Sequence, residues 1–429
     1  MLKLKDLKSS LKLYAVTDRY WLNGRKLIDD VEKAILGGAT MIQLREKDLD
    51  FDSFVAEAKK IKALCKKYDV PFIINDSLDV FLAVDADGIH VGQNDMRADL
   101  VREKIGPNKI LGVSAETVEE AILAQSMGAD YLGVGTIFNT TTKLDAITVS
   151  METLANICFN VDIPVVAIGG ITKDNIKDLK NTFIDGISVV SAIFAEKDIV
   201  SASKKLNEEV DKILFNPKKY NYFIVDYDGT LLNSLNMWTD VASRFIKSKG
   251  LTPEADLDLI VKKQTNAETA AYMQQKYFKD LTIDELANEI DSFIAKEYLS
   301  IIINDGVKEF LDILKSNGKL VLFTATSYPL IEASAKINNI FNYFDEFYTS
   351  TNFDYSKSDG KGFKLLKENN NIDLSKALVV EDATHALAGA KSAGFNVLGI
   401  KTWKNIKDYN IVKECCDYYI DIRKWIKWR

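Results

Sequence analysis

The chain has 429 residues, a length that predicts two or three domains. Its composition, 47% apolar and 27% charged, is that of an ordinary globular protein. The net charge of −7 argues against a general nucleic-acid-binding protein, although a local group of basic side chains can still bind an anionic substrate.

No run of apolar residues approaches the ~18 that a membrane span needs, and residues 1–10 lack the apolar core of a signal peptide. The four cysteines have the spacing of neither a zinc site nor a disulfide framework. Because there are only two histidines, the chemistry must depend mainly on carboxylates, lysines, arginines and bound metal. We expect a cytoplasmic protein that binds neither membrane nor nucleic acid.

Short apolar runs alternate with amphipathic stretches from residue 11 to about 194. This alternation predicts a (β/α)8 barrel, with a doubly wound open sheet as the alternative, because alternation alone does not establish closure. The predicted strands are Leu13–Val16, Met41–Leu44, Phe72–Ile74, Gly88–His90, Ile110–Val113, Tyr131–Val134, Val165–Ile168 and Gly186–Val190. The predicted helices include Lys26–Leu36, Phe51–Tyr68, Thr117–Gln125, Met151–Cys158 and Thr172–Lys180.

The stretch 42–48, Ile-Gln-Leu-Arg-Glu-Lys-Asp, lies at the end of the second predicted strand. Gln43, Arg45 and Lys47 alternate, so an extended backbone would project all three from one face. An amide, a guanidinium and an ammonium group together can hold an anion. Ordinary exposed charges at a strand end are the alternative, so the interpretation depends on the other strand ends.

Polar residues also follow the other strands, at the end where a barrel of this kind has its active site. Asp76 and Asp95 are suited to a hard cation such as Mg²⁺ that also contacts phosphate oxygens. Lys143 adds positive charge to that of 42–48, and the Gly169-Gly170 turn can cradle a second phosphate. Each residue alone could cap a helix or lie in a turn. Together they predict two anionic ligands, one of them with metal.

A set of motifs in the first ~212 residues resembles thiamine phosphate synthase. The matching stretches are 13–18, 42–48, 73–76, 87–95, 112–114, 133–143 and 167–171. One departure is Asn139, where the family usually has proline; it removes no ligand. The resemblance implies an enzyme that joins a pyrimidine diphosphate to a thiazole phosphate and releases pyrophosphate. His90 is expected to be a hydrogen-bonded structural residue at its strand end.

The resemblance also implies roles for individual residues. The aminopyrimidine diphosphate would be held by Gln43, Arg45, Lys47, Asn75, Ser114 and Lys143, the last also a catalytic candidate. One Mg²⁺ would be bound by Asp76 and Asp95. The thiazole phosphate would be held by Thr140, Thr142, Gly170, Val190 and Ser191.

The first domain, 1–214, should end with a helix over about Ile199–Leu214. Residues 215–221 are expected to be a linker, because proline, a turn former and charge separate two periodic regions. The second domain would then cover 222–429.

Two carboxylates follow the apolar strand Tyr222–Val225, in the run Asp226-Tyr-Asp228-Gly-Thr230. At a strand end, a loop can bring both to one metal; an Asp-Gly hairpin turn is the alternative. From Tyr222 to about Thr402, the chain resembles the phosphohydrolases of the haloacid dehalogenase superfamily. This resemblance implies a Rossmann-like domain in which Asp226 is the nucleophile and Asp228 the general acid/base.

Other roles follow from the same resemblance. Thr324 would bind the transferring phosphoryl group, and Lys357 or Lys361 would neutralise it. Residues 357–361 depart from the usual Lys-Pro-x-Pro form, so the two lysines stay alternatives, with Lys357 the better match. The acidic pair Glu381-Asp382 would complete a second Mg²⁺ site. The expected ligands there are Asp226, Asp228 and Asp382.

Residues 236–303 have a helical pattern, and the same resemblance implies that an insertion at this position is a cap over the site, of a length that favours small phosphate esters. Its predicted helices include Met237–Ser248, Ala267–Phe278 and Ile283–Tyr298. We therefore expect a bifunctional enzyme, a synthase followed by a Mg²⁺-dependent phosphatase acting on thiamine phosphate or a precursor. Two alternatives for the barrel stay open: a thiazole tautomerase and a non-catalytic ligand-sensing module. The sequence also leaves open the phosphatase substrate, the passage of intermediates between the sites, and a homo-oligomer.

Overall fold

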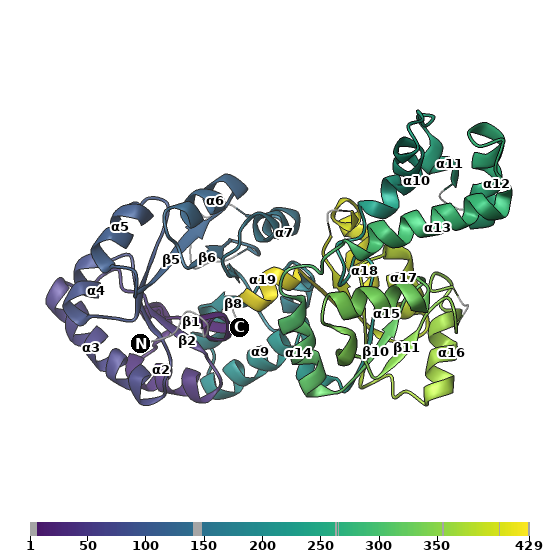
Figure 1. Cartoon of the computed structure of the whole chain (residues 1–429). Helices are drawn as coiled ribbons and strands as arrows, with labels where there is room; N and C mark the ends of the chain where they lie inside the picture. Colours follow the sequence, from purple (N-terminus) through teal and green to yellow (C-terminus); the bar gives the residue numbers. More distant parts are fainter. Residues whose placement is uncertain are drawn as a thin grey trace. The chain divides into compact units, whose positions relative to one another are not determined.

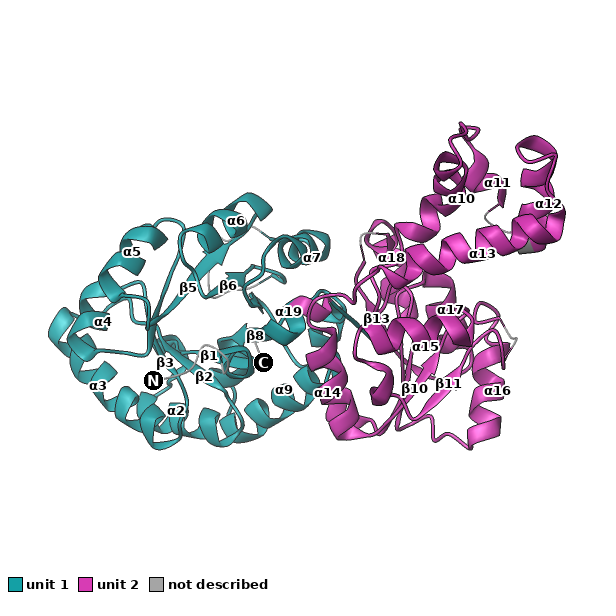
Figure 2. Ribbon diagram, viewed as in Figure 1, with its two compact units in different colours: residues 1–216, 417–420, 424–429 teal, residues 217–416, 421–423 magenta. Residues whose placement is uncertain are grey.

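The computed structural model describes residues 7–139, 148–261, 264, 266–353, 356–402 and 404–427. The chain forms two compact units, coloured separately in Figure 2. One unit comprises residues 1–216, 417–420 and 424–429, and the other comprises 217–416 and 421–423. No helix in the described ranges is both long and apolar enough to cross a membrane.

The first unit contains a closed barrel of eight parallel strands with helices around it (Figure 1). The barrel closes where β1 pairs with β8, in a register that places Tyr14 opposite Ser188. The predicted barrel is confirmed, and the open-sheet alternative is wrong. The strands are β1 (Leu13–Val16), β2 (Met41–Leu44), β3 (Phe72–Asn75), β4 (Gly88–Val91), β5 (Ile110–Ala115), β6 (Tyr131–Val134), β7 (Val165–Ile168) and β8 (Gly186–Val189).

The surrounding helices pack on the strands because each carries one apolar face. In α3 (Phe51–Lys67), Phe54, Ala58, Ile61 and Cys65 are buried at spacings of three or four residues. The other described helical elements of the unit are α1 (Leu7–Ser10), η2 (Arg19–Trp21), α2 (Leu27–Leu36), α4 (Leu78–Val84), α5 (Ala98–Ile105), α6 (Val118–Ser126), α7 (Met151–Asn160), η3 (Ile176–Leu179), α8 (Ser191–Phe194) and α9 (Ile199–Ile213).

The predicted helix at Thr172–Lys180 is wrong, because this stretch contains only the 3-10 turn η3. The side chain of Asn175 explains the difference. Its Oδ1 accepts a hydrogen bond from the backbone N of Thr172 at 2.8 Å, and its Nδ2 donates to the carbonyl of Gly170 at 2.9 Å. Side-chain bonds of this kind to the local backbone compete with helix formation.

The second unit is built on five strands of a sheet, in the order β11-β10-β9-β12-β13. The central strand β9 lies between β10 and β12 and runs parallel to both. These strands are β9 (Tyr222–Val225), β10 (Lys319–Phe323), β11 (Glu346–Tyr348), β12 (Ala377–Glu381) and β13 (Asn396–Ile400); β14 (Tyr418–Ile420) lies in residues 417–420, which are counted with the first unit. The helical elements that accompany them in the chain are η4 (Pro217–Lys219), α14 (Val307–Asn317), α15 (Tyr328–Ile337), η5 (Phe341–Tyr343), α16 (Lys361–Asn370), α17 (Thr384–Ser392), η6 (Asn405–Asp408), α18 (Tyr409–Cys415) and α19 (Ile422–Lys427).

A helical cap is inserted between β9 and β10, and it has an apolar cluster of its own that includes Phe245, Leu286 and Ile290. Its helices are α10 (Met237–Ser248), α11 (Leu257–Val261), α12 (Asn266–Lys276) and α13 (Ile283–Leu299). Three of these were predicted within two residues at each end; the short helix α11 was not.

We expect Gly186→Ala to destabilise the barrel. A Cβ at Gly186 would lie 1.9 Å from the carbonyl oxygen of Leu11, a backbone atom that cannot move without shifting the chain entering β1. Forcing extra atoms into a packed core costs roughly 1–3 kcal/mol. Thermal unfolding of the full chain should therefore begin at a lower temperature. In the comparison variant Gly106→Ala, the added Cβ meets nothing within 4 Å, so only its positive φ adds strain. Unchanged unfolding of Gly186→Ala would contradict this account.

Candidate active sites

The predicted binding residues of the barrel lie at one end of it. The parallel strands bring their carboxyl ends together there, and each described member of the set lies near the end of a strand or in the loop that follows. The described members of the set are Gln43, Arg45, Lys47, Asn75, Asp76, Asp95, Ser114, Gly170, Val190 and Ser191. Thr140, Thr142 and Lys143 lie outside the described residues.

The predicted alternation of Gln43, Arg45 and Lys47 does not hold along the whole stretch, because β2 ends at Leu44. Gln43 points into the barrel, where its Nε2 donates to the hydroxyl of Tyr14 at 2.5 Å. The guanidinium of Arg45 lies 3.6 Å from a carboxylate oxygen of Asp18, in the loop after β1. The amide therefore belongs to the barrel interior, and the two cations belong to the rim.

Glu46 holds two rim loops together. Its buried carboxylate accepts a hydrogen bond from Nε of Arg19 at 2.7 Å, which joins the loop after β2 to the turn after β1. Burial raises the pKa of Glu46 in spite of the opposing charge of Arg19. Because its carboxylate is turned inward, Glu46 supports the neighbouring Arg45 and Lys47 and is not a candidate base.

Asp76 and Asp95 interact at the rim. Partial burial of the carboxyl group, followed by the charge of Asp95, raises the pKa of Asp76 to about 6. Asp76 also adopts a φ of 60°, which non-glycine residues rarely do and which is typical of strained functional positions. Its backbone N donates to the carbonyl of His90 at 2.8 Å, which secures this conformation. Two carboxylates that repel each other suit a hard divalent cation.

The glycine turn after β7 packs closely against the loop after β6. Gly169 and Gly170 have φ values of 101° and 62°, and a Cβ at Gly170 would lie 2.4 Å from the carbonyl oxygen of Asn139. A side chain at this position would push the two loops apart. Val190 and Ser191 lie where β8 passes into α8, so backbone N–H groups at this corner are suited to a phosphate.

The second site is a buried cluster of carboxylates around Asp226. Asp226 directly follows β9, and Glu381 and Asp382 lie at the end of the neighbouring β12. One oxygen from each of the three lies within 4.8 Å of the others. Burial, followed by the charge of Glu381, raises the pKa of Asp226 to about 7, and the pKa of Asp382 is raised for the same reasons. The cluster therefore fits a divalent cation.

Lys357 enters this cluster and Lys361 does not. The Nζ of Lys357 lies 2.5 Å from Asp226 and 2.8 Å from Glu381. Burial opposes the charged form of Lys357, but these two carboxylates outweigh it and raise its pKa. The side chain of Lys361 is 76% exposed and pairs with Asp359. Thr324, the other predicted residue, is buried directly after β10.

The carboxylate of Asp228 lies outside the three-carboxylate cluster. Its Oδ1 accepts hydrogen bonds from Ser234 at 2.7 Å and from the indole of Trp238 at 3.2 Å. Its Oδ2 accepts from Tyr298 at 3.1 Å and from Thr326 at 2.7 Å. Trp238 and Tyr298 belong to the cap helices α10 and α13. Sequence reasoning missed these four donors, because only folding brings them to Asp228.

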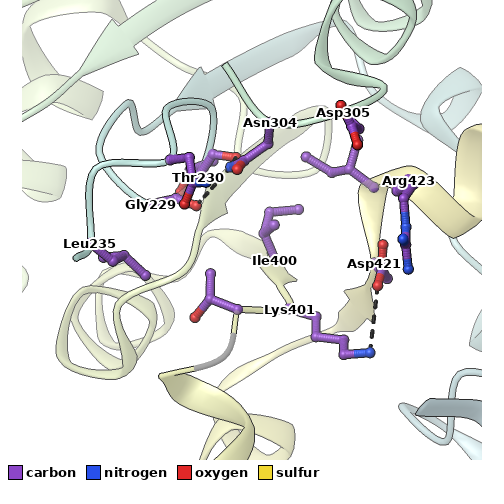
Figure 3. A pocket seen from close by; sticks show the side chains of 12 residues that line it. Gly229, Thr230, Leu235, Asn304, Asp305, Ile400, Lys401, Asp421 and Arg423 are labelled. Atoms are coloured by element: carbon purple, nitrogen blue, oxygen red, sulfur yellow. Dashed lines mark hydrogen bonds and ion pairs between the residues drawn. The ribbon is translucent and has the colours of Figure 1, made fainter. Parts of the chain in front are cut away.

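A cavity of about 260 Å³ lies beside the loop that carries the Asp-Gly-Thr motif (Figure 3). Nδ2 of Asn304 lies 3.3 Å from the carbonyl oxygens of both Gly229 and Thr230. Asn233 and Asn304 line the cavity from the two chain segments that connect the sheet with the cap. Asn304, which lies after the cap in the chain, thus braces the motif loop.

Comparison with known proteins identifies the first half. Residues 13–193 match the family model described as thiamine monophosphate synthase. The thiamine-phosphate synthase of Clostridium tetani is 54% identical over 194 residues, which are 45% of this chain and 93% of that protein. The chain belongs to the thiamine-phosphate synthase family. A solved thiamine phosphate pyrophosphorylase from Pyrococcus furiosus is 41% identical, with a TM-score of 0.46, and the match covers 49% of this chain and 100% of that one.

The second half has relatives of its own. Residues 223–400 match the family model described as haloacid dehalogenase-like hydrolase. A solved putative beta-phosphoglucomutase from Thermotoga maritima is 20% identical, with a TM-score of 0.41, and covers 48% of this chain and 97% of its own. The protein is an enzyme whose first half is a thiamine-phosphate synthase barrel and whose residues 223–400 match the haloacid dehalogenase-like hydrolase model.

We expect Mg²⁺ to stabilise the second half more strongly at pH 8 than at pH 6. Without metal, the raised pKa of Asp226 means that the folded state keeps a proton that the unfolded state has lost between about pH 4 and pH 7. Stability therefore falls as the pH rises through that window. A bound cation needs the ionised carboxylates and recovers the loss.

Thermal unfolding of the full chain with and without Mg²⁺ measures this difference. The Tm shift on adding Mg²⁺ should be larger at pH 8, and Asp226→Asn should lose most of it. In the control Asp359→Asn, a surface carboxylate is changed and the shift should be retained. Equal shifts at the two pH values would contradict the proposed charge balance.

Proposed function

We propose that the barrel condenses 4-amino-2-methyl-5-(diphosphooxymethyl)pyrimidine with 4-methyl-5-(2-phosphoethyl)thiazole, forming thiamine phosphate and pyrophosphate. The observation that carries this proposal is the 54% identity to a thiamine-phosphate synthase over 93% of its length. The strand-end positions of Gln43, Asn75 and Ser114 support it, because they provide polar groups around one pocket.

The proposed reaction needs stabilisation of a departing anion rather than a proton acceptor. The bond between the pyrimidine methylene carbon and the diphosphate oxygen breaks, its electron pair leaves with pyrophosphate, and the thiazole nitrogen bonds to the carbon. Arg45, Lys47 and Lys143 would contact the diphosphate. Asp76 and Asp95 would hold Mg²⁺, which when bound neutralises charge that develops on the pyrophosphate.

The thiazole phosphate would occupy the corner between the loops after β6, β7 and β8. The tight packing of Gly170 against the loop after β6 favours backbone contacts to a phosphate there. The proposed ligands are Thr140, Thr142, Gly170, Val190 and Ser191. Placing the two rings in adjacent subsites supplies the alignment that a reaction between two substrates requires.

For the second half, we propose a phosphatase that works through an aspartyl-phosphate on Asp226. The carboxylate of Asp226 attacks phosphorus, and Asp228 donates a proton to the departing oxygen and later takes one from the attacking water. Lys357 and Thr324 would hold the transferring group. Cap residues contact Asp228 directly, which supports a separate role in proton transfer for this carboxylate.

Mg²⁺ at this site would be held by Asp226 and Asp382. Glu381 is already engaged, since its Oε1 accepts from the backbone N of Asp382 and of Ala383 and its Oε2 pairs with Lys357. Asp228 was also an expected ligand, but its carboxylate oxygens face four other donors. When bound, the cation supplies charge stabilisation to the transferring phosphoryl group. The substrate we propose is a small phosphate ester, thiamine phosphate or one of its two phosphorylated precursors.

Asp76→Ala should reduce formation of thiamine phosphate from the two phosphorylated rings at least about 100-fold, because it removes half of the proposed cation site. Asp79→Ala is the matched control, a carboxylate three residues away on the exposed side of α4, and should keep normal activity. Phosphate release at the second site should be unaffected by either change. Full synthase activity in Asp76→Ala would contradict the assignment.

Lys357→Met should abolish phosphate release in a panel that contains thiamine phosphate and both precursors, whereas Lys361→Met should not. The reason is geometric, because only Lys357 reaches Asp226. Asp226→Asn should be inactive and form no covalent phosphoenzyme with a labelled substrate. Release of phosphate by Asp226→Asn at the rate of the unaltered chain would contradict the aspartyl-phosphate mechanism.

A further inference from the structure

A chain of hydrogen bonds crosses the inside of the barrel from Gln43 to Ser114. Gln43 Nε2 bonds the hydroxyl of Tyr14 at 2.5 Å, and that hydroxyl lies 2.9 Å from the hydroxyl of Tyr131. The hydroxyl of Tyr131 lies 3.0 Å from Nδ1 of His90, whose Nε2 lies 3.0 Å from Oγ of Ser114. The five residues come from five different strands.

The three inner residues of this hydrogen-bond chain are buried, and they are closely packed. Tyr14 and Tyr131 are 1% and 0% exposed, and His90 is 9% exposed. Burial raises the pKa of both tyrosines, and both ring nitrogens of His90 are bonded to neutral hydroxyl groups. A Cβ at Gly112 would lie 2.2 Å from Cζ of Tyr131 and 2.4 Å from Nδ1 of His90. The glycine makes the space that this arrangement needs.

In a neutral hydrogen-bond chain of this kind, donation can run in either of two directions, because each hydroxyl group has one hydrogen to donate. In the first, the amide of Gln43 donates to Tyr14, donation continues through Tyr131 to Nδ1 of His90, and a protonated Nε2 donates to Ser114. In the second, every bond is reversed and the amide is turned over. A mixture leaves a buried hydroxyl hydrogen without an acceptor, at a cost of about 1–3 kcal/mol. The amide orientation and the histidine tautomer are therefore coupled.

The two ends of the chain would meet chemically different parts of the proposed pyrimidine diphosphate. Gln43 is 4% exposed and suits the neutral ring, whereas Ser114 is half-buried near the rim and suits the diphosphate. A ring amino group needs an acceptor, and a diphosphate oxygen needs a donor. Only the first direction offers a carbonyl oxygen at Gln43 and a hydroxyl hydrogen at Ser114.

We propose that Tyr14, Tyr131 and His90 are positioning residues that set the hydrogen-bond polarity of the pyrimidine pocket, so that Gln43 presents its carbonyl oxygen and Ser114 its hydroxyl hydrogen. The inference rests on the proposed synthase function. Through Gln43, the three buried side chains would make the pocket select a 4-amino pyrimidine over a 4-oxo pyrimidine. An oxo group would face the carbonyl oxygen of Gln43, and neither group could donate a hydrogen bond to the other.

The tautomer of His90 tests the direction without any turnover. The chain has two histidines, so a full-length sample labelled with ¹⁵N-histidine gives two imidazole patterns, which His385→Gln assigns. In substrate-free protein at neutral pH, we expect His90 to carry its proton on Nε2 with Nδ1 bare. A proton on Nδ1, or a charged ring, would overturn the proposal even if the synthase activity is confirmed.

Selectivity tests the consequence. The full chain should use the 4-amino pyrimidine diphosphate in preference to its 4-oxo analogue, and Tyr14→Phe should reduce the ratio of kcat/KM values about 10-fold or more by freeing the amide of Gln43 to turn. Tyr68→Phe is the matched control and should leave the ratio unchanged. It also deletes one tyrosine hydroxyl group, which donates a hydrogen bond to Glu32 among the outer helices, away from the hydrogen-bond chain. An unchanged ratio in Tyr14→Phe would overturn the proposal.

A double variant separates positioning from general structural damage. Tyr14→Phe and His90→Asn interrupt the same chain, so the double variant should lose little more selectivity than the worse single variant. Losses of selectivity that multiply would overturn the proposal, because they would mean that the two residues act independently. Absence of all turnover in the unaltered chain would refute the synthase function instead, and the tautomer of His90 would still report the direction.

Discussion

Repulsion between carboxylates at strand ends is the constraint to which the rest of each site responds. Parallel strands deliver Asp76 and Asp95 to the barrel rim, and Asp226 and Asp382 to the carboxyl ends of two neighbouring central strands of the second sheet. In both places burial, followed by the charge of a neighbouring carboxylate, raises carboxyl pKa values. A bound cation would reduce this repulsion between the carboxylates, and an anionic substrate could bind to the cation. The folding of each half therefore brings together carboxylates that suit the cation proposed for it.

The two halves place their charged side chains differently. The barrel keeps its charges at the rim and its interior neutral, with tyrosines and a histidine that burial holds uncharged. The second half buries its carboxylates and brings a lysine among them, so Lys357 partly balances the charge before any ligand binds. Asp226 and Asp228 are two residues apart, yet one lies in the charged cluster and the other is held by neutral donors. Their environments separate their proposed roles.

The sequence by itself determined the fold class and most element boundaries. Alternation of apolar runs with amphipathic segments reports which faces are buried, and this local property predicts the barrel, whereas the second sheet was expected from the motifs around Asp226 and the family they resemble. The candidate residues of the barrel could be grouped in advance, because they follow predicted strands and parallel strands end together; their roles stay predictions. It did not predict η3 in place of a helix, since Asn175 competes for backbone groups in a way that periodicity does not register.

Only the tertiary structure decided which side chains meet. It selected Lys357 over Lys361, since both lie near the same motif and only one reaches Asp226. It ended β2 at Leu44, which separates the Gln43 amide from the cations that follow. It also assembled the hydrogen-bond chain from residues up to 117 positions apart. No local pattern records such contacts, because they depend on strand register and on which side chains point into a closed barrel.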